Sequence, residues 1–310
     1  MRRGAPQVSI GMPVYNGERF LREAVDSILG QTFEDFELII SDNGSADRTR
    51  EICEEYAARD RRVRYYRNER NVGAAKNFAR VFELASGEYF KWAAYDDVCA
   101  PALIERCVEV LNRMPSVVLS YARTVIIDVA GRPVKKWNDN LNLRSPRASE
   151  RYRRYHERFH HDATCYPLFG VMLAHVLRRT PLLPGYIASD QILLGELALR
   201  GEFYEVPEYL FFQRDHVRSS VQGFPAFRDR IRWYDPEKSG RFHLTRWRWL
   251  WEYAKSIRRV KLEPTERALC YFQCARWAIW NARGLVEDLV EPVLWPVMAG
   301  YFRRVQGYGG

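Results

Sequence analysis

The sequence predicts an α/β protein in which a mostly parallel sheet is flanked by helices and followed by a helical C-terminal extension. Strand-like and helix-like periodicity alternate over residues 8–94. The intervals between strands are short, so the strands must run parallel with right-handed crossovers. The last third instead has helical periodicity and is rich in Trp and Arg. With 47% hydrophobic residues in a chain of 310, a large core can form, which excludes general disorder.

The first part of the chain has the alternating pattern that predicts the parallel sheet. Helical spacing of apolar residues begins near Glu18 and stops at Gly30, begins again near Asp47, and recurs over Gly73–Leu84. The predicted strands between and around these helices are Val8–Gly11, Phe36–Ser41, Val63–Arg67 and Glu88–Ala94.

The middle part has a different character. A helix opens at Ser189 and Asp190 and ends at Gly201. Turn residues around Gly131 predict a hairpin, and a polar stretch after it predicts a mobile loop. The hairpin strands are Val117–Asp128 and Pro133–Trp137, the loop is Asn138–Glu150, and further strands are expected at Tyr166–Leu173, Phe203–Val206 and Glu208–Gln213.

Composition limits the setting of the protein. The net charge of +9 comes mainly from arginine and favours phosphate-bearing ligands or an anionic membrane surface. The six cysteines form no CxxC pair, which is typical of reduced thiols in a cytosolic protein. No stretch reaches the ~18 apolar residues of a membrane span. No apolar signal region follows the first residues, so we expect a cytoplasmic protein, with the cytoplasmic face of the membrane as the alternative.

Polar clusters follow several predicted strands. They are Pro13, Tyr15 and Asn16 after the first strand, Asp42–Ser45 after the second, and Asp96 with Asp97 after the fourth. Ligands bind beyond the carboxyl ends of parallel strands, so these clusters should converge. Adjacent carboxylates suggest a divalent cation, although a solvated turn or a helix cap is the competing interpretation.

Two further segments have competing interpretations. Asp42 can simply close a turn, or its carboxylate can accept a hydrogen bond from a nucleobase. Asn71 and Lys76 flank the start of a predicted helix, where amides and one ammonium group could lie beside a diphosphate. The glycine spacing of a P-loop or of a dinucleotide fingerprint is absent from this segment.

The combination of these segments resembles family 2 of the inverting glycosyltransferases. The resemblance is carried by Val8–Asn16, Gln31–Phe33, Phe36–Ser45, Asn71–Gly73 and Asp96–Asp97, and it covers roughly residues 6–216. It implies a GT-A fold, a nucleotide-sugar donor, and Mn²⁺ or Mg²⁺ as cofactor. It also implies a nucleotide-sugar-binding part over residues 1–98, an acceptor-binding and catalytic part over 99–225, and a helical extension over 226–310.

The resemblance also implies roles for single residues. Pro13, Tyr15 and Asp42 match positions that hold the nucleobase, Asp96 matches the carboxylate near the ribose, and Asp97 matches the metal ligand. This sequence has Ala94-Tyr95 where many members of the family have another acidic residue. The resemblance therefore does not fix how tightly the protein binds a metal ion.

Three residues further along the chain complete the implied site. Asp190 matches the usual catalytic base, although Ser189 precedes it where Glu is commoner; a helix-capping role is the alternative. His216 is expected near the metal and Arg214 near the diphosphate. The Gln-x-x-Arg-Trp signature of processive synthases is absent, which favours addition of a single sugar.

These observations predict a metal-dependent inverting transferase that uses UDP- or dTDP-sugar and a saccharide, lipid-linked or small-molecule acceptor. The stretch Phe242–Val260 has Leu, Trp, Ala and Ile near one helical face, so it either packs on the catalytic domain or makes peripheral membrane contact. A basic nucleic-acid-binding protein is the main alternative, but clustered carboxylates would repel nucleic acid. A membrane-surface scaffold with a degenerate transferase domain is a third alternative. The presence of Asp42, Asp97 and Asp190 argues against such degeneration.

Overall fold

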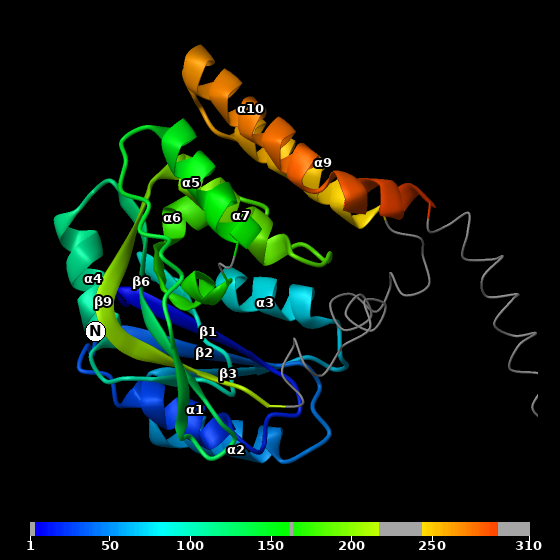
Figure 1. The fold of residues 1–310 in the computed structure, drawn as a ribbon. Helices are drawn as coiled ribbons and strands as arrows, with labels where there is room; N and C mark the ends of the chain where they lie inside the picture. The colour runs from blue at the N-terminus through cyan, green and yellow to red at the C-terminus, as the bar shows by residue number, and fades with distance from the viewer. Residues whose placement is uncertain (1–3, 162–163, 217–243, 291–310) are drawn as a thin grey trace, which may run out of the picture.

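The computed structural model describes residues 4–161, 164–216 and 244–290, and it confirms the α/β fold class (Figure 1). In these residues the strands form one nine-stranded sheet with the order β3-β2-β1-β4-β8-β6-β9-β5, and β7 pairs with β6. The sheet therefore joins strands that lie far apart in the sequence.

The first half of the sheet is parallel, as predicted. β1 (Val8–Val14) lies between β2 (Phe36–Asp42) and β4 (Tyr89–Trp92), and β2 pairs with β3 (Val63–Arg67). The crossovers are α1 (Leu21–Leu29), α2 (Thr49–Arg59) and α3 (Ala74–Glu83). Because β1, β2 and β4 run in one direction, their carboxyl ends lie at the same edge of the sheet.

The second half of the sheet mixes directions. β6 (Val117–Ile127) runs parallel to β9 (Glu202–Arg214), while β8 (Val171–Leu173) is antiparallel to both β4 and β6. The short β5 (Val98–Cys99) is antiparallel to β9. β7 (Pro133–Trp137) forms the predicted hairpin with β6.

Helices cover both faces of the sheet (Figure 1). α1, α2 and α4 (Leu103–Arg113) contribute to one buried apolar cluster. A second cluster contains residues of α3, α5 (Ala148–His161), α6 (Ala174–Leu177) and α7 (Ser189–Arg200). α9 (Thr245–Arg259) and α10 (Pro264–Trp280) join this second cluster and form an outer layer over α5 and α7.

Several sequence-based expectations need correction. β1 extends to Val14, three residues beyond the predicted end. Tyr166–Leu173 is not one strand: Tyr166–Phe169 is a 3₁₀ helix, η1, and only Val171–Leu173 pairs in the sheet. Pro167 lies in η1 and has no N–H to give to a ladder. The expected strands Phe203–Val206 and Glu208–Gln213 are one strand, β9, which carries register irregularities instead of a break.

The stretch Asn138–Glu150 is not an exposed mobile loop. Leu141 and Leu143 are fully buried, and Asp139 is only 3% exposed. The hydroxyl and amide of Thr164 donate to the Asp139 carboxylate at 2.6 and 2.7 Å. Burial of two leucines holds this segment against the core, and α5 already begins at Ala148.

The C-terminal extension packs on the rest of the molecule. Packing on the catalytic domain was one of the two interpretations of this stretch, and peripheral membrane contact was the other. Tyr253 and Ile257 of α9 are buried, whereas Trp247 and Trp251 are exposed, so the residues expected on one common face are divided between core and surface. No helix in the described ranges has both the length and the apolar character to cross a membrane. The expected boundary at residues 225/226 and the helix expected from Phe224 to residue 243 lie outside the described residues. The boundary at 98/99 falls within β5.

Candidate active site

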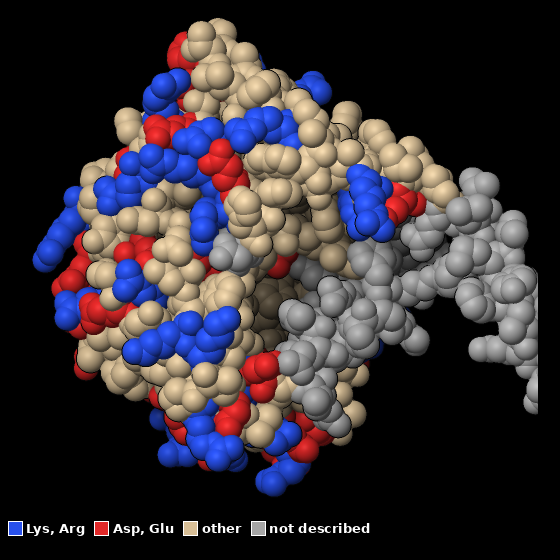
Figure 2. All heavy atoms as spheres, in the orientation of Figure 1, with Lys and Arg blue, Asp and Glu red and all other residues tan. Residues whose placement is uncertain are grey.

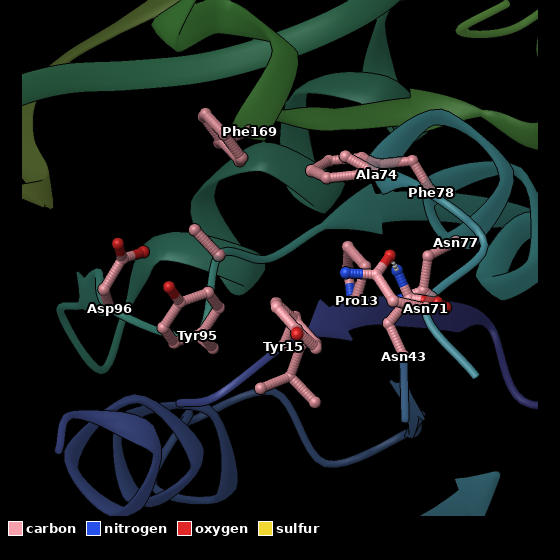
Figure 3. A pocket seen from close by; sticks show the side chains of 12 residues that line it. Pro13, Tyr15, Asn43, Asn71, Ala74, Asn77, Phe78, Tyr95, Asp96 and Phe169 are labelled. Carbon is pink, nitrogen blue, oxygen red and sulfur yellow. Dashed lines mark hydrogen bonds between the residues drawn. The ribbon is translucent and has the colours of Figure 1, made fainter. Parts of the chain in front are cut away.

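A pocket lies at the carboxyl ends of β1, β2 and β4, where the polar clusters were expected to converge (Figure 3). It is also walled by the start of α3 and by η1. Its lining consists of Pro13, Val14, Tyr15, Asn43, Asn71, Ala74, Asn77, Phe78, Ala94, Tyr95, Asp96 and Phe169. Pro13, Tyr15, Asn71 and Asp96 were predicted from the sequence.

The pocket has two chemically different ends. Figure 3 shows the asparagines Asn43, Asn71 and Asn77 at one end and Asp96 with Tyr95 at the other. Asp96 is the one carboxylate among the lining residues. Aromatic rings, including that of Tyr15, lie between the ends. The cavity thus offers neutral amides to one part of a ligand and a negative charge to another.

The asparagine end is held together by hydrogen bonds between side chains. The Asn43 amide donates to Asn71 Oδ1 at 2.9 Å and accepts from the Val72 N–H at 3.0 Å. Asn77 accepts from the Ser41 hydroxyl at 2.7 Å and donates to the Ser41 carbonyl at 2.8 Å. These bonds fix the loop before α3 to the end of β2, so the amides are positioned before any ligand binds.

The start of α3 faces this end of the pocket. α3 begins at Ala74 without a side-chain cap, after Gly73 with φ of 91°. That φ is in the left-handed region, which glycine adopts most readily. The positive end of the helix dipole therefore lies at the pocket wall. Lys76, predicted beside a diphosphate, is exposed and is not a lining residue.

Asp42 does not reach the pocket, contrary to the prediction. It is completely buried, and its carboxylate accepts from the Ser45 N–H at 2.8 Å and from the Tyr65 hydroxyl at 3.0 Å. Arg67 lies 3.4 Å from the same carboxylate. Asn43, the next residue, is a lining residue of the pocket, although it is only 2% exposed and its amide is hydrogen-bonded within the protein. Neighbouring positions at a strand end face opposite sides, which is why Asn43 and not Asp42 is among the lining residues.

Asn16 also has a local role. It is exposed, its φ is 51°, and its side-chain oxygen accepts from the Ala46 N–H at 2.9 Å. It is not a lining residue. The side chain therefore joins the loop after β1 to the loop after β2, rather than facing the cavity.

The two adjacent carboxylates face different surroundings. Asp96 Oδ2 lies 2.9 Å from Nε2 of His216, whose ring packs on Phe20 with centroids 5.1 Å apart. Asp97 is buried, and its Oδ1 accepts from the Arg214 backbone N–H at 2.9 Å. Burial and the nearby charge of Asp96 raise the pKa of Asp97 well above its usual range. The expected metal ligand, Asp97, thus points inward, and Asp96 lies at the cavity.

Arg214 does not point to the pocket as a diphosphate ligand would. Its side chain is 1% exposed, and each guanidinium nitrogen has an acceptor. Nε donates to the Asp96 carbonyl at 2.9 Å, one terminal nitrogen to the Asp128 carbonyl at 3.1 Å, and the other to Glu23 at 2.6 Å. The group therefore ties the Asp96 loop to α1 and to the end of β6. In this arrangement the guanidinium group is used within the protein, and a role at the diphosphate is not proposed for it.

Lys91 is a buried cation below the pocket that sequence reasoning missed. It is completely buried, and its ammonium group donates to the carbonyl of Trp92 at 3.2 Å and to the carbonyl of Phe169. Phe169 lines the pocket, so Lys91 connects β4 to the opposite wall. A lysine inside an otherwise apolar predicted strand was the available signal.

Asp190 lies at the start of α7, as predicted, but it is not a lining residue of the pocket. It is partly buried, and one carboxylate oxygen accepts from the Gln191 N–H at 2.9 Å. Burial raises its pKa, while a hydrogen bond from the Cys165 thiol opposes the rise. Cys165 directly precedes η1, whose last residue, Phe169, lines the pocket. Asp190 is thus connected to the pocket through η1.

A metal ion at this site would be coordinated by protein side chains together with oxygens of a bound ligand. Among the described residues, no group of three or more His, Cys, Asp or Glu side chains is arranged to hold a metal ion. The six cysteines are all free thiols, five of them buried. Magnesium and manganese sites in nucleotide enzymes commonly use one or two protein groups together with phosphate oxygens. Asp96 and His216 provide such a pair.

Solved structures with the same fold define the class. TarS residues 1–349 from S. aureus superpose with a TM-score of 0.60 at 17% identity, covering 88% of this chain and 71% of that one. The mannosyltransferase PcManGT from Pyrobaculum calidifontis, in complex with GDP-Man and Mn²⁺, gives 0.57 at 16% identity, covering 92% and 74%. The fold is thus the GT-A fold of glycosyltransferases, as the sequence predicted.

The chain matches the sequence profile of Glycosyl transferase family 2 over residues 9–179, and it belongs to this family. It is 37% identical over 125 residues to an uncharacterised glycosyltransferase of Rickettsia typhi, covering 40% of this chain and 38% of that one. It is also 37% identical over 98 residues to the glycosyltransferase GlyG of Streptococcus pneumoniae, covering 32% and 33%. The chain spans well under half the length of these two relatives.

Proposed function

We propose that the protein transfers a single sugar from a nucleoside-diphosphate sugar to an acceptor hydroxyl, with inversion at the anomeric carbon and with Mn²⁺ or Mg²⁺ bound. The observation that carries the proposal is the pocket with two ends: amides for a nucleobase and Asp96 beside His216 for a metal-bound diphosphate. Family membership supports a nucleotide-sugar donor.

The base is proposed to lie at the asparagine end. The amino group of an asparagine side chain can donate to a carbonyl oxygen of uracil or thymine. Asn71 Oδ1 already accepts from Asn43 and from the Gly73 N–H, so its amino group is the part oriented for a ligand. Tyr15 and Phe78 offer ring faces for stacking. UDP and dTDP sugars are therefore the donors to test first, and the exposed Asn71, rather than the buried Asp42, is the proposed base-recognition residue.

The diphosphate is proposed to lie at the other end. Asp96 and His216 would hold the divalent ion, because a carboxylate oxygen and an imidazole nitrogen are both ligands for Mn²⁺. When bound, the ion would offset negative charge on the departing diphosphate. Arg214 acts on this end as a positioning residue, since it holds the carbonyl of Asp96.

Asp190 remains the proposed catalytic base. Inverting transfer needs one carboxylate to take the proton from the acceptor hydroxyl as its oxygen attacks the anomeric carbon. The raised pKa of Asp190 brings this carboxyl closer to the pKa expected of a base working near neutral pH. Cys165 orients it by hydrogen bonding. The acceptor would then approach from the η1 side of the pocket.

The setting of the reaction stays a prediction. Free cysteines are consistent with the cytoplasm. Peripheral membrane contact was predicted for the C-terminal helices, and on α9 the exposed tryptophans Trp247 and Trp251 and the exposed Arg248 and Arg258 would carry it. Nucleic acid is not expected as a partner, because on the face in Figure 2 basic and acidic side chains are interspersed.

A donor panel tests the proposal. UDP-, dTDP- and GDP-sugars would be incubated with the protein and Mn²⁺, and release of nucleoside diphosphate would be measured with and without simple saccharide acceptors. We expect release from a pyrimidine donor that stops when EDTA is added. Release from none of the donors, together with no binding of any nucleoside diphosphate in calorimetry, would contradict the proposed function.

A further inference from the structure

The outer surface of α10 is apolar although it is exposed. Ile279 is 73% exposed, and Phe272 and Val286 are each 58% exposed. After a turn at Asn281 the chain is helical again over residues 282–290. Backbone hydrogen bonds from Asn281 to Trp277 at 3.0 Å and from Leu285 to Asn281 at 2.9 Å connect the two helical pieces.

These exposed residues follow a heptad pattern. Going along the helix, seven of the exposed apolar positions are separated alternately by four and three residues: Ala268, Phe272, Ala275, Ile279, Ala282, Val286 and Leu289. We call this set the α10 seam. Leu269, Tyr271 and Val290 are exposed beside this line. The opposite side of the helix is buried, and it includes Cys270, Cys274, Trp277 and Leu285. A helix that is apolar on both sides normally has a partner on each.

The spacing of the α10 seam indicates a helix as its partner. A repeat of 3.5 residues keeps one line of side chains facing a second helix, whereas a single helix lying on a flat surface gains nothing from it. Small and large residues alternate along the seam from Ala268 to Val286, with alanine at positions 268, 275 and 282. Such alternation allows large side chains of one helix to fit over small ones of the other.

The seam is complementary to itself when two copies run antiparallel. In the register centred between Ala275 and Ile279, each Ala275 faces Ile279 of the second copy. Phe272 then faces Ala282 of the second copy, and Val286 faces Ala268 of the second copy. The layers from Ala268 to Val286 therefore each pair one large residue with one alanine, and Leu289 at the end of the seam faces Thr265 of the second copy. Such an isologous contact closes as a dimer and leaves no surface for further addition.

The charges of α10 disfavour a lipid surface as the partner. Residues 264–290 contain three arginines and three carboxylates, and no lysine. The arginines nearest the seam are already paired: Arg276 lies 3.3 Å from Glu157, and Arg283 lies 2.9 Å from Glu287. An interfacial membrane helix instead carries a surplus of Lys and Arg on its polar face.

We propose that the α10 seam is a dimer interface that pairs with a second copy of this chain in antiparallel orientation. The exposed side chains of two seams would together bury on the order of 1,200 Å², which is the lower end of specific interfaces. α10 lies in the outer layer of the molecule (Figure 1), and none of its residues lines the pocket. The proposal does not depend on the proposed enzymatic function.

Sedimentation velocity on the full chain tests the dimer. We expect a wild-type dimer at micromolar concentration and an Ile279→Glu variant whose dimer dissociation constant rises about 100-fold or more, because a carboxylate would be buried opposite alanine. Ile279 is exposed in one chain, so the melting temperature of the variant monomer should not fall. Val134→Glu is the matched control, since Val134 is 66% exposed on β7, and it should leave the dimer unchanged.

Cross-linking tests the orientation. An equal mixture of Phe272→Cys and Ala282→Cys chains should form a disulfide between copies under mild oxidation, whereas neither variant should do so alone. A cross-link in Phe272→Cys alone would overturn the antiparallel arrangement. A monomeric wild type, or an unchanged dimer in Ile279→Glu, would overturn the proposal. A monomer that floats with phosphatidylglycerol vesicles, and loses this binding in Ile279→Glu, would assign the seam to a membrane instead.

Discussion

Replacing Arg214 by methionine should lower stability much more than donor affinity. The guanidinium donates to the carbonyls of Asp96 and Asp128, and methionine can fill the space but cannot donate. Each carbonyl that loses its donor costs about 1–3 kcal/mol, so the free energy of unfolding should fall by about 2–6 kcal/mol. The ion pair with the half-exposed Glu23 adds at most ~1 kcal/mol. The melting temperature should fall by roughly 3–10 °C.

Thermal and urea unfolding measure this change, and calorimetry with UDP measures affinity below the transition. Glu23→Gln is the matched control: it removes only the exposed partner and should change the free energy of unfolding by less than ~1 kcal/mol. The reasoning would be refuted by an Arg214→Met variant that melts like wild type but binds UDP tenfold or more weakly. That result would support the role predicted from the sequence, in which Arg214 binds the diphosphate.

Further predictions concern the base end and the catalytic base. Asn71→Ala should weaken nucleotide binding about tenfold both with and without Mn²⁺, because one amide contact is lost. Asp42→Asn should leave affinity nearly unchanged and lower the melting temperature, and the reverse result in a binding titration would restore Asp42 as the base ligand. Asp190→Asn should keep donor affinity and lower turnover ~10²–10⁴-fold, and retention of full turnover when chemistry is rate-limiting would exclude it. In the wild type, kcat/KM should rise with pH through a pKa above the usual Asp range, since burial raises the pKa of Asp190 and only the ionised form is a base. Replacing Cys165 by Ala should move this acid limb to still higher pH, because the thiol hydrogen bond lowers that pKa.

The sequence predicted the parallel half of the sheet because there each strand and helix has its own local periodicity. It also placed the pocket correctly, since the carboxyl ends of parallel strands must meet at one edge. It could not say which of two neighbouring residues faces the cavity. Asp42 and Asn43, like Asp96 and Asp97, differ by one position, and the backbone at a strand end decides which side chain turns inward.

The rest of the site depends on contacts between distant parts of the chain. Arg214 looked like a ligand for phosphate because it follows an apolar strand, yet its partners lie on α1 and at the end of β6. Leu141 and Leu143 lie in a polar stretch that has no periodicity, and their burial comes from tertiary packing. Phe169 reaches the pocket from η1, far from the other lining residues in sequence. Local patterns do not report such contacts.

The central claim is that the two-ended pocket binds a nucleoside diphosphate whose metal is held at Asp96. Calorimetry with UDP, in the presence and absence of Mn²⁺, tests it on wild type, Asp96→Asn and Asp97→Asn. Asp97→Asn is the control, because its side-chain oxygen can still accept the Arg214 N–H. We predict that Mn²⁺ tightens UDP binding in wild type and in Asp97→Asn, and that this enhancement disappears in Asp96→Asn. Enhancement that survives in Asp96→Asn but is lost in Asp97→Asn, or no UDP binding at all, would contradict the claim.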